Sequence, residues 1–550
     1  MRKLNHKSRS DPFGEEEKMR IPGVTLILIT AILLMAMPFS VHAYRPDAPF
    51  TALLKANQKK WMAEDKQTAA KLAALRDKFE KPPNIIYILA DDVGWGELGW
   101  QGGGKHRGTP TPELDKMAFE GMRFWAAYAE PSCTPTRIAI NTGRHPVRTG
   151  LLSVLWPGQT EGLSPEEETI AEVLSKVGYQ TAMWGKWHLG DLEEHAPENQ
   201  GYDYAYYGLY NGAPYAWPDA AAMYEGKTPP GSAMFFDFPG EKAYKADAGI
   251  SLAPGFYRAR ADQKRRPVGK ISQKGLADFE QECYSQIIAY VKEKARSERP
   301  FFIYWATYTQ QVAGAPEYQD TAHVDRANPQ ASFMVRHNDH VQNLLDTLRK
   351  EKIAENTLVV WISDNGPMYG FWPIAGYSWL RGAKGDVLEG GVRVPAMAWW
   401  PGMIAAGQDP VDVIHVTDLY TTAASIAGAV SEIPSDRVTD GIDQTALLLL
   451  GEGHGRRKFM FHYSGGHLGA VRWGDIKMHI LSGGAHGGLP PMKTYNVMRD
   501  PGEKFGKMYP YLWTVTPFQN LIKSHKLMIR KFPHRVSKTM PAGAEITPHD

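Results

Sequence analysis

Residues 84–92 read Asn-Ile-Ile-Tyr-Ile-Leu-Ala-Asp-Asp, and this stretch decides the fold class. Seven uncharged and mostly apolar residues are followed at once by two carboxylates. A continuous apolar run of this length is typical of a strand that is buried on both faces of a parallel sheet. The sequence therefore predicts a central strand over residues 84–90, with Asp91 and Asp92 at its carboxyl end.

Three further apolar runs repeat this pattern along the chain. They cover residues 180–184, 301–305 and 358–362. Apolar residues at helical spacing lie between these runs, for example Val341, Leu344, Leu345 and Leu348. Cys283 falls on the apolar side of another such helix and is predicted to be a core thiol. This order predicts an α/β fold with a large mixed, mostly parallel sheet that is flanked by helices.

One of these helices has a predicted start as well as a predicted end. Ser164-Pro165-Glu166-Glu167 fits a capping box with proline in the first helical turn. Apolar residues then recur at helical spacing up to Val177, and Gly178 is suited to end the helix. We therefore expect the helix to begin at Ser164.

The sequence changes in texture after about residue 450. Residues 459–463, 469–473 and 476–480 form short, closely spaced strand candidates. We predict a catalytic α/β domain over residues 44–455, in which residues 50–80 form an amphipathic helix. A smaller C-terminal subdomain over residues 456–550 would contain a short antiparallel sheet and end in a loose tail from residue 535.

Residues 1–43 are predicted to be a secretory signal peptide. A polar, net basic leader precedes the uncharged apolar run 24–37, and Val41-His42-Ala43 follows at the spacing of a cleavage site. The apolar run is short for a spanning helix, which needs about 20 residues. We therefore expect the export machinery to deliver the protein to the periplasm or the exterior. An uncleaved segment that anchors the protein in the membrane is the alternative.

Composition excludes several classes of protein. The chain has 550 residues, with 62 Lys and Arg against 60 Asp and Glu. This balance speaks against a nucleic-acid-binding protein, which usually has a basic excess. Only two cysteines are present, Cys133 and Cys283. A disulfide scaffold and a cysteine-rich zinc site are therefore excluded.

Acidic residues follow two of the predicted strands. Asp91 and Asp92 come after one strand, and Asp364-Asn365 come after the strand at 358–362. Ligand sites of open α/β sheets lie beyond the carboxyl ends of the strands. Carboxylates that converge there repel one another unless a cation neutralises them, and oxygen ligands suit calcium or magnesium. Acidic turns without a ligand are the alternative interpretation.

A third element is Cys133-Thr134-Pro135-Thr136-Arg137, which is followed by Thr142-Gly143-Arg144. Cys-x-Pro-x-Arg with a trailing Thr-Gly-Arg is similar to the signature of the sulfatase family. Four further stretches resemble motifs of that family and occur in the family's order. They are residues 88–96, 185–190, 363–367 and 381–395. The resemblance spans about residues 83–402 and continues more weakly in 470–473 and 500–503.

The resemblance implies a specific cofactor chemistry. In the sulfatase family a formylglycine-generating enzyme oxidises the signature cysteine to formylglycine, which hydrates to a geminal diol. One hydroxyl of the diol attacks the sulfur of a sulfate ester, and the other loses its proton as inorganic sulfate is expelled. The implied metal is Ca²⁺, with Mg²⁺ as the alternative. The implied metal ligands are Asp91, Asp92, Asp364, Asn365 and the modified Cys133.

The resemblance also implies roles for basic residues. It places Lys186 and Lys384 on the sulfate group and Arg137 beside the diol and the metal. It places His188 on the second hydroxyl, as the base for elimination. The alternative interpretation is that the two lysines are solvated surface residues and that the histidine is structural.

Two departures from the family's pattern bear on the substrate. The family has a histidine after the strand at 301–305 that meets the leaving group, whereas Gln311 takes this position here. Glutamine does not act as a general acid. Either Lys384 or His323 supplies the proton, or the leaving group needs little help, which favours aryl or other activated sulfates. The second departure is milder: Thr136 stands where serine is commonest, so conversion of Cys133 is still expected.

Several questions stay open at this level. Residues 202–217 are dense in aromatics, which either line the mouth of the substrate pocket or pack an irregular insertion. The same motifs would also serve a phosphonate monoester or phosphodiester hydrolase. An inactive sulfatase-like binding protein is a third hypothesis, suggested by Gln311. The sequence gives neither the natural ester nor the oligomeric state.

Overall fold

The structure is a computed structural model that describes most of the chain after the predicted signal peptide. The described residues are 44–155, 159–212, 255–261, 263–268, 273–309, 315–318, 324, 329–371, 375–480, 493–506 and 509–533. The predicted signal peptide, the predicted tail, Gln311 and His323 all lie outside the described residues.

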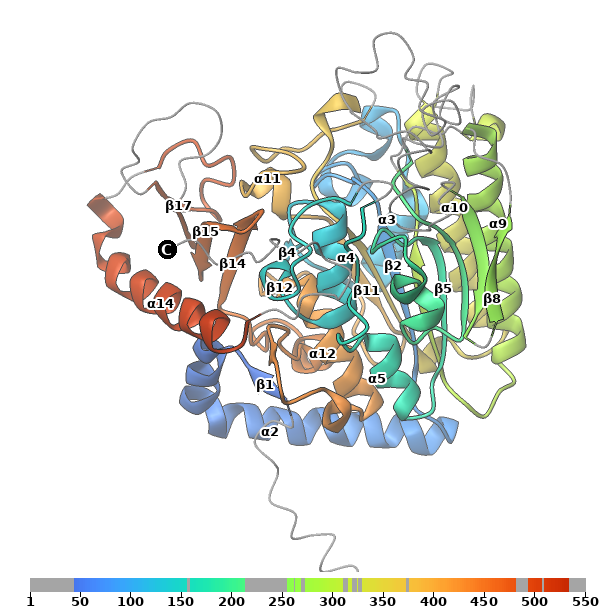
Figure 1. Ribbon diagram of the computed structural model, residues 1–550, viewed down its shortest axis with the longest axis horizontal. Helices are drawn as coiled ribbons and strands as arrows, with labels where there is room; N and C mark the ends of the chain where they lie inside the picture. Colours follow the sequence, from blue (N-terminus) through green and yellow to red (C-terminus); the bar gives the residue numbers. More distant parts are fainter. Residues whose placement is uncertain are drawn as a thin grey trace, which may run out of the picture. The chain divides into compact units, whose positions relative to one another are not determined.

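A nine-stranded mixed sheet forms the centre of the fold (Figure 1). Its strand order is β3-β11-β10-β2-β9-β5-β6-β7-β8. The strands are β2 (Asn84–Ala90), β3 (Met122–Arg123), β5 (Gln180–Lys186), β6 (Tyr204–Gly208), β7 (Phe256–Arg260), β8 (Gln263–Val268), β9 (Phe301–Ala306), β10 (Thr357–Ser363) and β11 (Ala396–Trp399). The five central strands, β10 to β6, run parallel, and the strands at both edges pair antiparallel. The predicted α/β class is confirmed.

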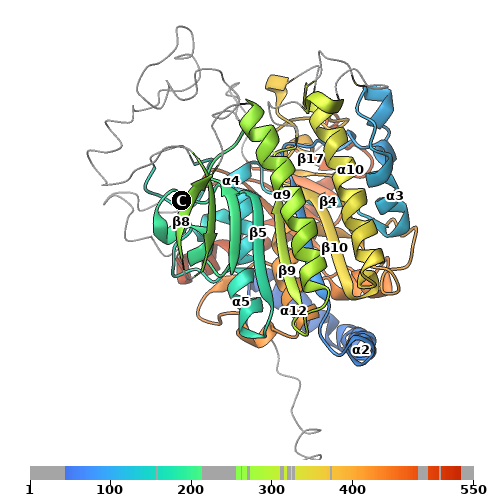
Figure 2. The ribbon, with the colours of Figure 1, turned by 90° about the vertical axis from the view of Figure 1, so that its right-hand side faces the viewer.

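Helices cover both faces of this sheet (Figure 2). Helices α3 (Pro112–Glu120), α9 (Gln273–Lys294) and α10 (Pro329–Lys350) pack on one face. Helices α4 (Cys133–Thr142), α5 (Ile170–Lys176) and α12 (Val416–Ala427) pack on the other. The side chains of β2 alternate between the two cores, with Ile86 and Ile88 in one and Ile85 and Leu89 in the other. This double burial explains why the strand is apolar throughout.

The register of the central strands sets the position of the acidic residues. Ser363 of β10 lies opposite Ala90 of β2, so Asp364 and Asp91 leave the sheet next to each other. Ala306 of β9 lies opposite both Leu89 of β2 and Gly185 of β5. The carboxyl ends of four neighbouring strands, β10, β2, β9 and β5, therefore lie side by side, as expected for a ligand site in an α/β fold.

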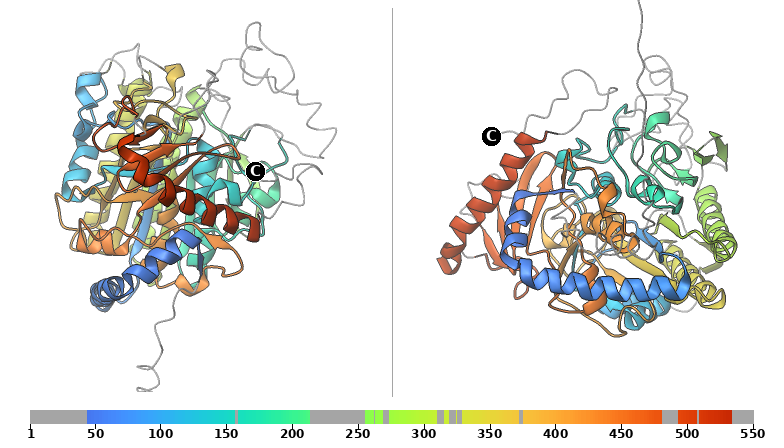
Figure 3. Two further views of the ribbon diagram at one scale, coloured as in Figure 1. Left: turned by 90° about the vertical axis from the view of Figure 1, so that its left-hand side faces the viewer. Right: turned by 90° about the horizontal axis from the view of Figure 1, so that it is seen from below.

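A separate four-stranded antiparallel sheet lies near the C-terminus, as predicted. It consists of β14 (Phe459–Ser464), β15 (His467–Trp473), β16 (Ile476–His479) and β17 (Thr494–Asn496). Helix α14 (Val515–Lys531) and the first turns of α2 (Ala48–Phe79) pack beside this sheet (Figure 3). Phe50, Trp61, Phe461 and Phe518 belong to their shared core. The domain boundary at residue 456 stays a prediction.

Smaller elements complete the fold. β1 (Arg45–Pro46) pairs with β13 (Val438–Thr439), and β4 (Ala126–Tyr128) pairs with β12 (Val413–His415). Helices α11 (Glu389–Val392) and α13 (Thr445–Leu450) are short. Among the described residues, no helix is both long and apolar enough to cross a membrane.

The predicted start of α5 is wrong. The helix begins at Ile170, and its capping box consists of Thr169 and Glu172, whose side chains each accept a hydrogen bond from the other's backbone N–H. Ser164 to Glu167 form a turn instead. The capping pattern occurs twice within nine residues, and the first copy is not used because Glu167 is buried in an ion pair with Arg144.

The aromatic stretch at 202–217 is resolved in part. Tyr204 to Gly208 form strand β6 of the main sheet. Tyr202, Tyr206 and Tyr207 are buried, and their rings contact other aromatic rings of the core. The packing interpretation therefore holds for this part, while residues 213–217 lie outside the described residues.

Candidate active site

Side chains from three separate segments meet beyond the carboxyl ends of β2 and β10. Oxygen atoms of Asp91, Asp92 and Asp364 and the sulfur of Cys133 all lie within 4.8 Å of one another. All four side chains are buried. The structure thus brings the predicted acidic ligands and the predicted nucleophile together in one cluster.

Cys133 is the first residue of α4, and its sulfur stands where the formylglycine oxygens would be. The sulfur lies 3.6 Å from Asp91 Oδ1 and accepts a 2.9 Å hydrogen bond from Lys384 Nζ. Burial, together with the negative charge of Asp364, raises the pKa of the thiol to about 12. The unmodified thiol is therefore neutral at physiological pH, and a neutral thiol is a weak nucleophile.

The donor set suits a hard cation. Asn365 donates from Nδ2 to Asp92 Oδ1 over 2.6 Å, whereas its Oδ1 atom is buried and has no partner among the described residues. Burial and repulsion from Asp364 raise the pKa of Asp91 to about 7. Crowded carboxylates and an unused amide oxygen fit calcium or magnesium, which bind oxygen ligands. The residues named from the sequence therefore fit the implied metal.

Two lysines contact these carboxylates. Lys186 Nζ lies 2.9 and 2.8 Å from the two carboxylate oxygens of Asp91. Lys384 Nζ donates to Asp92 Oδ1 over 2.6 Å. The side chain of Lys186 is fully buried, and that of Lys384 is 17% exposed. The interpretation of both as solvated surface lysines is therefore wrong.

Arg137 and Thr136 connect helix α4, which carries the predicted nucleophile, to the strand ends. Arg137 donates to Asp364 Oδ2 over 2.9 Å and to the backbone oxygen of Lys186 over 2.7 Å. Burial opposes its charge, but the carboxylates of Asp364 and Asp91 hold its pKa above the ordinary value. The Thr136 hydroxyl accepts from the Glu130 backbone N–H and donates to the Asp364 carbonyl. Threonine thus supplies the hydroxyl that the family's serine would supply.

His188, the predicted base, is buried near Lys186 and Arg137. Burial and the positive charges of Lys186 and Arg137 hold its pKa well below the ordinary value. Its Nε2 atom donates to the Leu155 carbonyl over 2.9 Å, which leaves Nδ1 as an acceptor. Nδ1 is buried and has no partner among the described residues. A neutral imidazole with a free nitrogen can accept a proton.

The backbone at the site is strained at two positions. Asp92 and His188 both have φ of +59°, in the left-handed region that non-glycine residues rarely occupy. Such outliers persist where the surrounding structure holds them, often at functional sites. Gly185, just before Lys186, has φ of +99°, and a Cβ there would lie 1.8 Å from the Ala306 oxygen.

One supporting residue was not identified from the sequence. Ser363, the last residue of β10, accepts from the Val93 backbone N–H over 3.0 Å and donates to the Asn365 carbonyl over 3.1 Å. It thereby fixes the turns that carry Asp92 and Asn365. A hydroxyl at the end of an otherwise apolar strand is the signal that would have revealed it. Gln311, together with His323 as a candidate proton donor, lies outside the described part of the chain.

Comparisons with known proteins agree with this geometry. The sequence model of the family described as Sulfatase matches residues 83–429, more than half of the chain. The chain is 34% identical to arylsulfatase A of Homo sapiens over 457 residues, which cover 77% of this chain and 83% of that protein. It is 33% identical to N-acetylgalactosamine-6-sulfatase of Canis lupus familiaris over 414 residues, covering 73% and 72%.

A solved structure is similar over an even larger part of the chain. The PsFucS1 sulfatase from Pseudoalteromonas sp. superposes with a TM-score of 0.76 and 31% identity, covering 86% of this chain and 95% of that one. The family match, the sequence relatives and the fold all agree with the motifs and the buried cluster. The chain belongs to the sulfatase family, whose members hydrolyse sulfate esters.

Proposed function

We propose that this protein hydrolyses sulfate esters through a formylglycine derived from Cys133. The observation that carries the proposal is the position of Cys133, in contact with Lys384 and within 4.8 Å of three carboxylates. A hydrated formylglycine supplies an oxygen nucleophile and a second hydroxyl whose ionisation releases sulfate. A formylglycine-generating enzyme would be needed during maturation.

Asp91, Asp92, Asp364 and Asn365 would hold one divalent cation, Ca²⁺ or Mg²⁺, beside residue 133. A bound cation supplies positive charge that favours ionisation of a neighbouring hydroxyl. Exhaustive chelation should therefore abolish hydrolysis, and added Ca²⁺ or Mg²⁺ should restore it. The concentration of each ion that restores half of the activity would identify the preferred metal. Full activity after chelation would contradict a metal role.

The basic residues would bind the substrate and transfer protons. Lys186 and Lys384 place two ammonium groups at the cluster, which suits a sulfate group and the charge that develops on its bridging oxygen. Arg137 would hold the Asp364 side chain in place relative to helix α4. The free Nδ1 atom of His188 would take the proton of the second hydroxyl. Gln311 would contact the leaving group.

We propose aryl or other activated sulfates as the preferred substrate class. Gln311 cannot donate a proton as the family's histidine would, so a good leaving group is favoured. Gln311→His should accelerate hydrolysis of esters with poor leaving groups more than that of esters with good ones. An equal effect across a series of leaving-group pKa values would contradict this assignment.

The decisive experiment compares two ester classes on protein of known modification state. The mass of the peptide that contains residue 133 should show an aldehyde instead of a thiol. Rates on an aryl sulfate should exceed those on the matching aryl phosphonate. A higher kcat/KM on the phosphonate would instead assign the site to phosphoryl chemistry. No turnover by fully modified, metal-loaded protein would instead favour a binding function.

We further propose that the protein is exported to the periplasm or the exterior, on the basis of the sequence of residues 1–43. Cleavage after Ala43 would give a mature chain that starts at Tyr44. Mass measurement of the N-terminal peptide from the native host tests this proposal. An intact leader in membrane fractions would favour the anchored alternative.

A further inference from the structure

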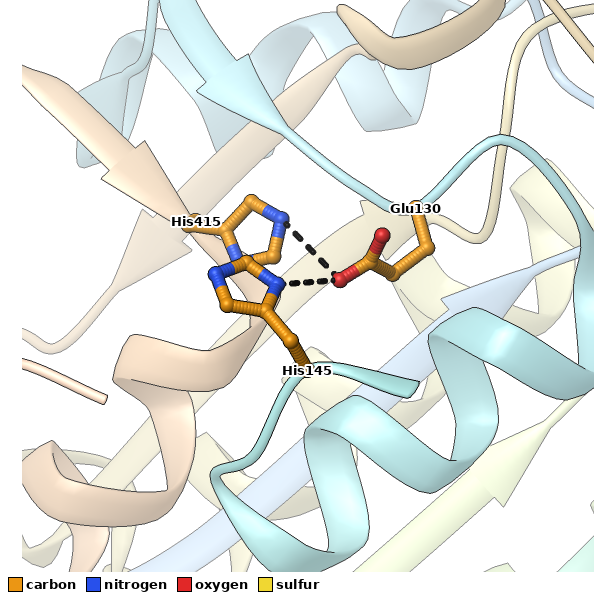
Figure 4. Close-up of side chains that lie close together, drawn as sticks. All are labelled: Glu130, His145 and His415. Atoms are coloured by element: carbon orange, nitrogen blue, oxygen red, sulfur yellow. Dashed lines mark hydrogen bonds and ion pairs between the residues drawn. The ribbon is translucent and has the colours of Figure 1, made fainter. Parts of the chain in front are cut away.

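A second buried cluster lies behind the candidate active site and consists of Glu130, His145 and His415. Figure 4 shows the Glu130 carboxylate directed at both imidazole rings. Glu130 Oε1 lies 2.6 Å from His145 Nδ1 and 3.8 Å from His415 Nε2. All three side chains are buried. None of them takes part in the chemistry proposed above.

The three residues come from segments that frame helix α4. Glu130 lies two residues after β4 and three residues before Cys133. His145 lies three residues after the last residue of α4, Thr142. His415 ends β12, where it pairs with Tyr128 of β4, and it caps α12, which packs on the same face of the sheet as α4. The cluster therefore joins both ends of the nucleophile's helix to a neighbouring strand and helix.

The hydrogen bonds identify which atoms carry protons. His415 Nδ1 accepts from the Thr417 backbone N–H, so its proton is on Nε2, which faces Glu130. Burial and the neighbouring His145 hold the pKa of His415 well below its ordinary value, so this ring is neutral. Burial opposes protonation of His145, but the carboxylates of Glu130 and Asp440 raise its pKa. Glu130 Oε1 thus lies 2.6 Å from His145 Nδ1 and faces the neutral N–H of His415 over 3.8 Å.

This arrangement differs from that of a metal site made of the same residue types. Two ligands of one tetrahedral zinc ion lie roughly 3.3 Å apart, given zinc–ligand bonds of about 2.0 Å. The 2.6 Å contact between Glu130 and His145 is a hydrogen bond. A His415 that bound zinc through Nε2 would also carry its proton on Nδ1 and would lose its bond from Thr417.

Further hydrogen bonds of the Glu130 and His145 backbones link the cluster to the active-site carboxylates and to the end of α4. The Glu130 N–H donates to the Thr136 hydroxyl, which in turn donates to the Asp364 carbonyl. The His145 N–H donates to Asp440 Oδ2 over 2.8 Å, and the Asp440 N–H donates to the Gly143 carbonyl over 2.8 Å. Movement of Glu130 or His145 would therefore displace the segment that carries Cys133.

We propose that Glu130, His145 and His415 are positioning residues for Cys133: their cluster, in which Glu130 accepts a hydrogen bond from His145 and lies 3.8 Å from His415, closes the two ends of helix α4 and holds its first residue against the carboxylates. The expected effect on kcat rests on the proposed sulfatase function, whereas the expected effect on the position and mobility of helix α4 does not. A displacement of about 1 Å at a reacting group can lower the rate about 100-fold.

Other charged or titratable groups also face His145 and must be considered in the pH dependence. They are Asp440 after β13, Arg457 before β14, His415 before α12, Tyr463 of β14 and His525 of α14. Asp440 is itself paired with Arg148 over 2.8 Å. Glu130 and Asp440 are the two negative groups that favour the protonated ring.

Glu130→Gln and His145→Gln test the proposal, with His479→Gln as the matched control. His479 Nε2 lies 2.6 Å from Glu503 Oε1 in the C-terminal sheet, the same distance as in the Glu130–His145 pair. Metal-loaded full-length protein is used, and kcat is divided by the fraction of molecules that carry formylglycine. Both test variants should lower kcat by about 10- to 100-fold with little change in KM. The double variant should be no worse than the worse single variant, because both remove one interaction.

A second measurement is independent of catalysis. Amide hydrogen exchange of peptides that cover residues 129–148 should be about 10-fold faster in both test variants and unchanged in His479→Gln. Unchanged exchange together with kcat within about twofold of wild type would overturn the proposal. If the wild type showed no turnover but amide exchange were faster in the variants, the proposed sulfatase function would be contradicted and the positioning role would stand. Binding of one equivalent of zinc by the wild type but not by His415→Gln would overturn the proposal, because the cluster would then be a metal site.

Discussion

The two ends of helix α4 handle buried charge in opposite ways. Beside Cys133, at the start of the helix, three carboxylates crowd together and share their cationic partners. Around the end of the helix, Glu130 pairs with His145, while Asp440 and Asp47 both pair with Arg148. Matched pairs stabilise a fold, whereas a crowded set keeps binding capacity for a ligand. The contrast separates the reactive end of the helix from the end that holds it in place.

Removal of the nucleophile should give the largest effect. Cys133→Ala should lower hydrolysis by about 10⁴-fold or more, because no group is left to form the covalent intermediate. The thermal unfolding midpoint should change little, since the sulfur accepts only one bond from a lysine that also pairs with Asp92. Rates and melting curves of the two proteins check this. Hydrolysis close to that of the wild type would refute the role of residue 133.

The buried lysine beside Asp91 should contribute more to the free energy of unfolding than a lysine in an exposed ion pair. In chelator, Lys186→Met should destabilise the protein by roughly 3–5 kcal/mol, because Asp91 loses a buried partner. Lys78→Met is the matched control, since the Lys78–Glu355 pair is exposed and should contribute at most about 1 kcal/mol. Denaturant unfolding measures both. Equal losses would mean that burial does not distinguish the two pairs.

The matched end should have a characteristic pH dependence. The pKa of His145 is raised in the folded state, so its pairing stabilises the protein below about pH 6.5 and is lost as the pH rises through the folded-state value. The stability difference between wild type and His145→Gln should therefore be about 2 kcal/mol at pH 5.5 and smaller at pH 9. Unfolding curves at both pH values test the sign. A stability difference that increases with pH would contradict the raised pKa of His145.

The connection between the two ends should give the smallest effect. Thr136→Val keeps the side-chain shape but removes the hydroxyl that links the Glu130 N–H to the Asp364 carbonyl. We expect a loss of about 1–2 kcal/mol, since a buried N–H is left without a partner. Thr136→Ser keeps the hydroxyl and should stay within about 0.5 kcal/mol of the wild type. A serine variant as unstable as the valine variant would show that the methyl group matters instead.

The sequence predicted best those features that depend on local pattern. The strand at 84–90 was found because burial on both faces demands apolar residues at every position. The edge strand β8 was not found, because Gln263 to Val268 are mostly exposed and carry three basic residues. The predicted start of α5 is wrong because Ser164 and Thr169 offer the same capping pattern, and the glutamate of the first copy is engaged by Arg144 in the folded structure.

In the candidate site, too, some residues could be predicted from local sequence patterns and others could not. Its acidic and basic residues lie in recognisable motifs, so they could be named in advance. The Glu130–His145–His415 cluster could not, because His415 is 285 positions away from Glu130 and stands in none of the recognised motifs. The strained backbone of Asp92 and His188 was also unpredictable, because only the surrounding structure imposes it.

One contact near the beginning of the described chain has a consequence for the order of assembly. Asp47, the cap of α2, pairs with His525 of α14, 478 positions further along, and with Arg148, which follows Cys133 by fifteen. A contact between residues so distant in sequence forms late, because the whole intervening chain must first be synthesised. Cys133 is 1% exposed in the finished fold. A maturation enzyme that acts on this residue would therefore have to reach it before the surrounding fold is complete.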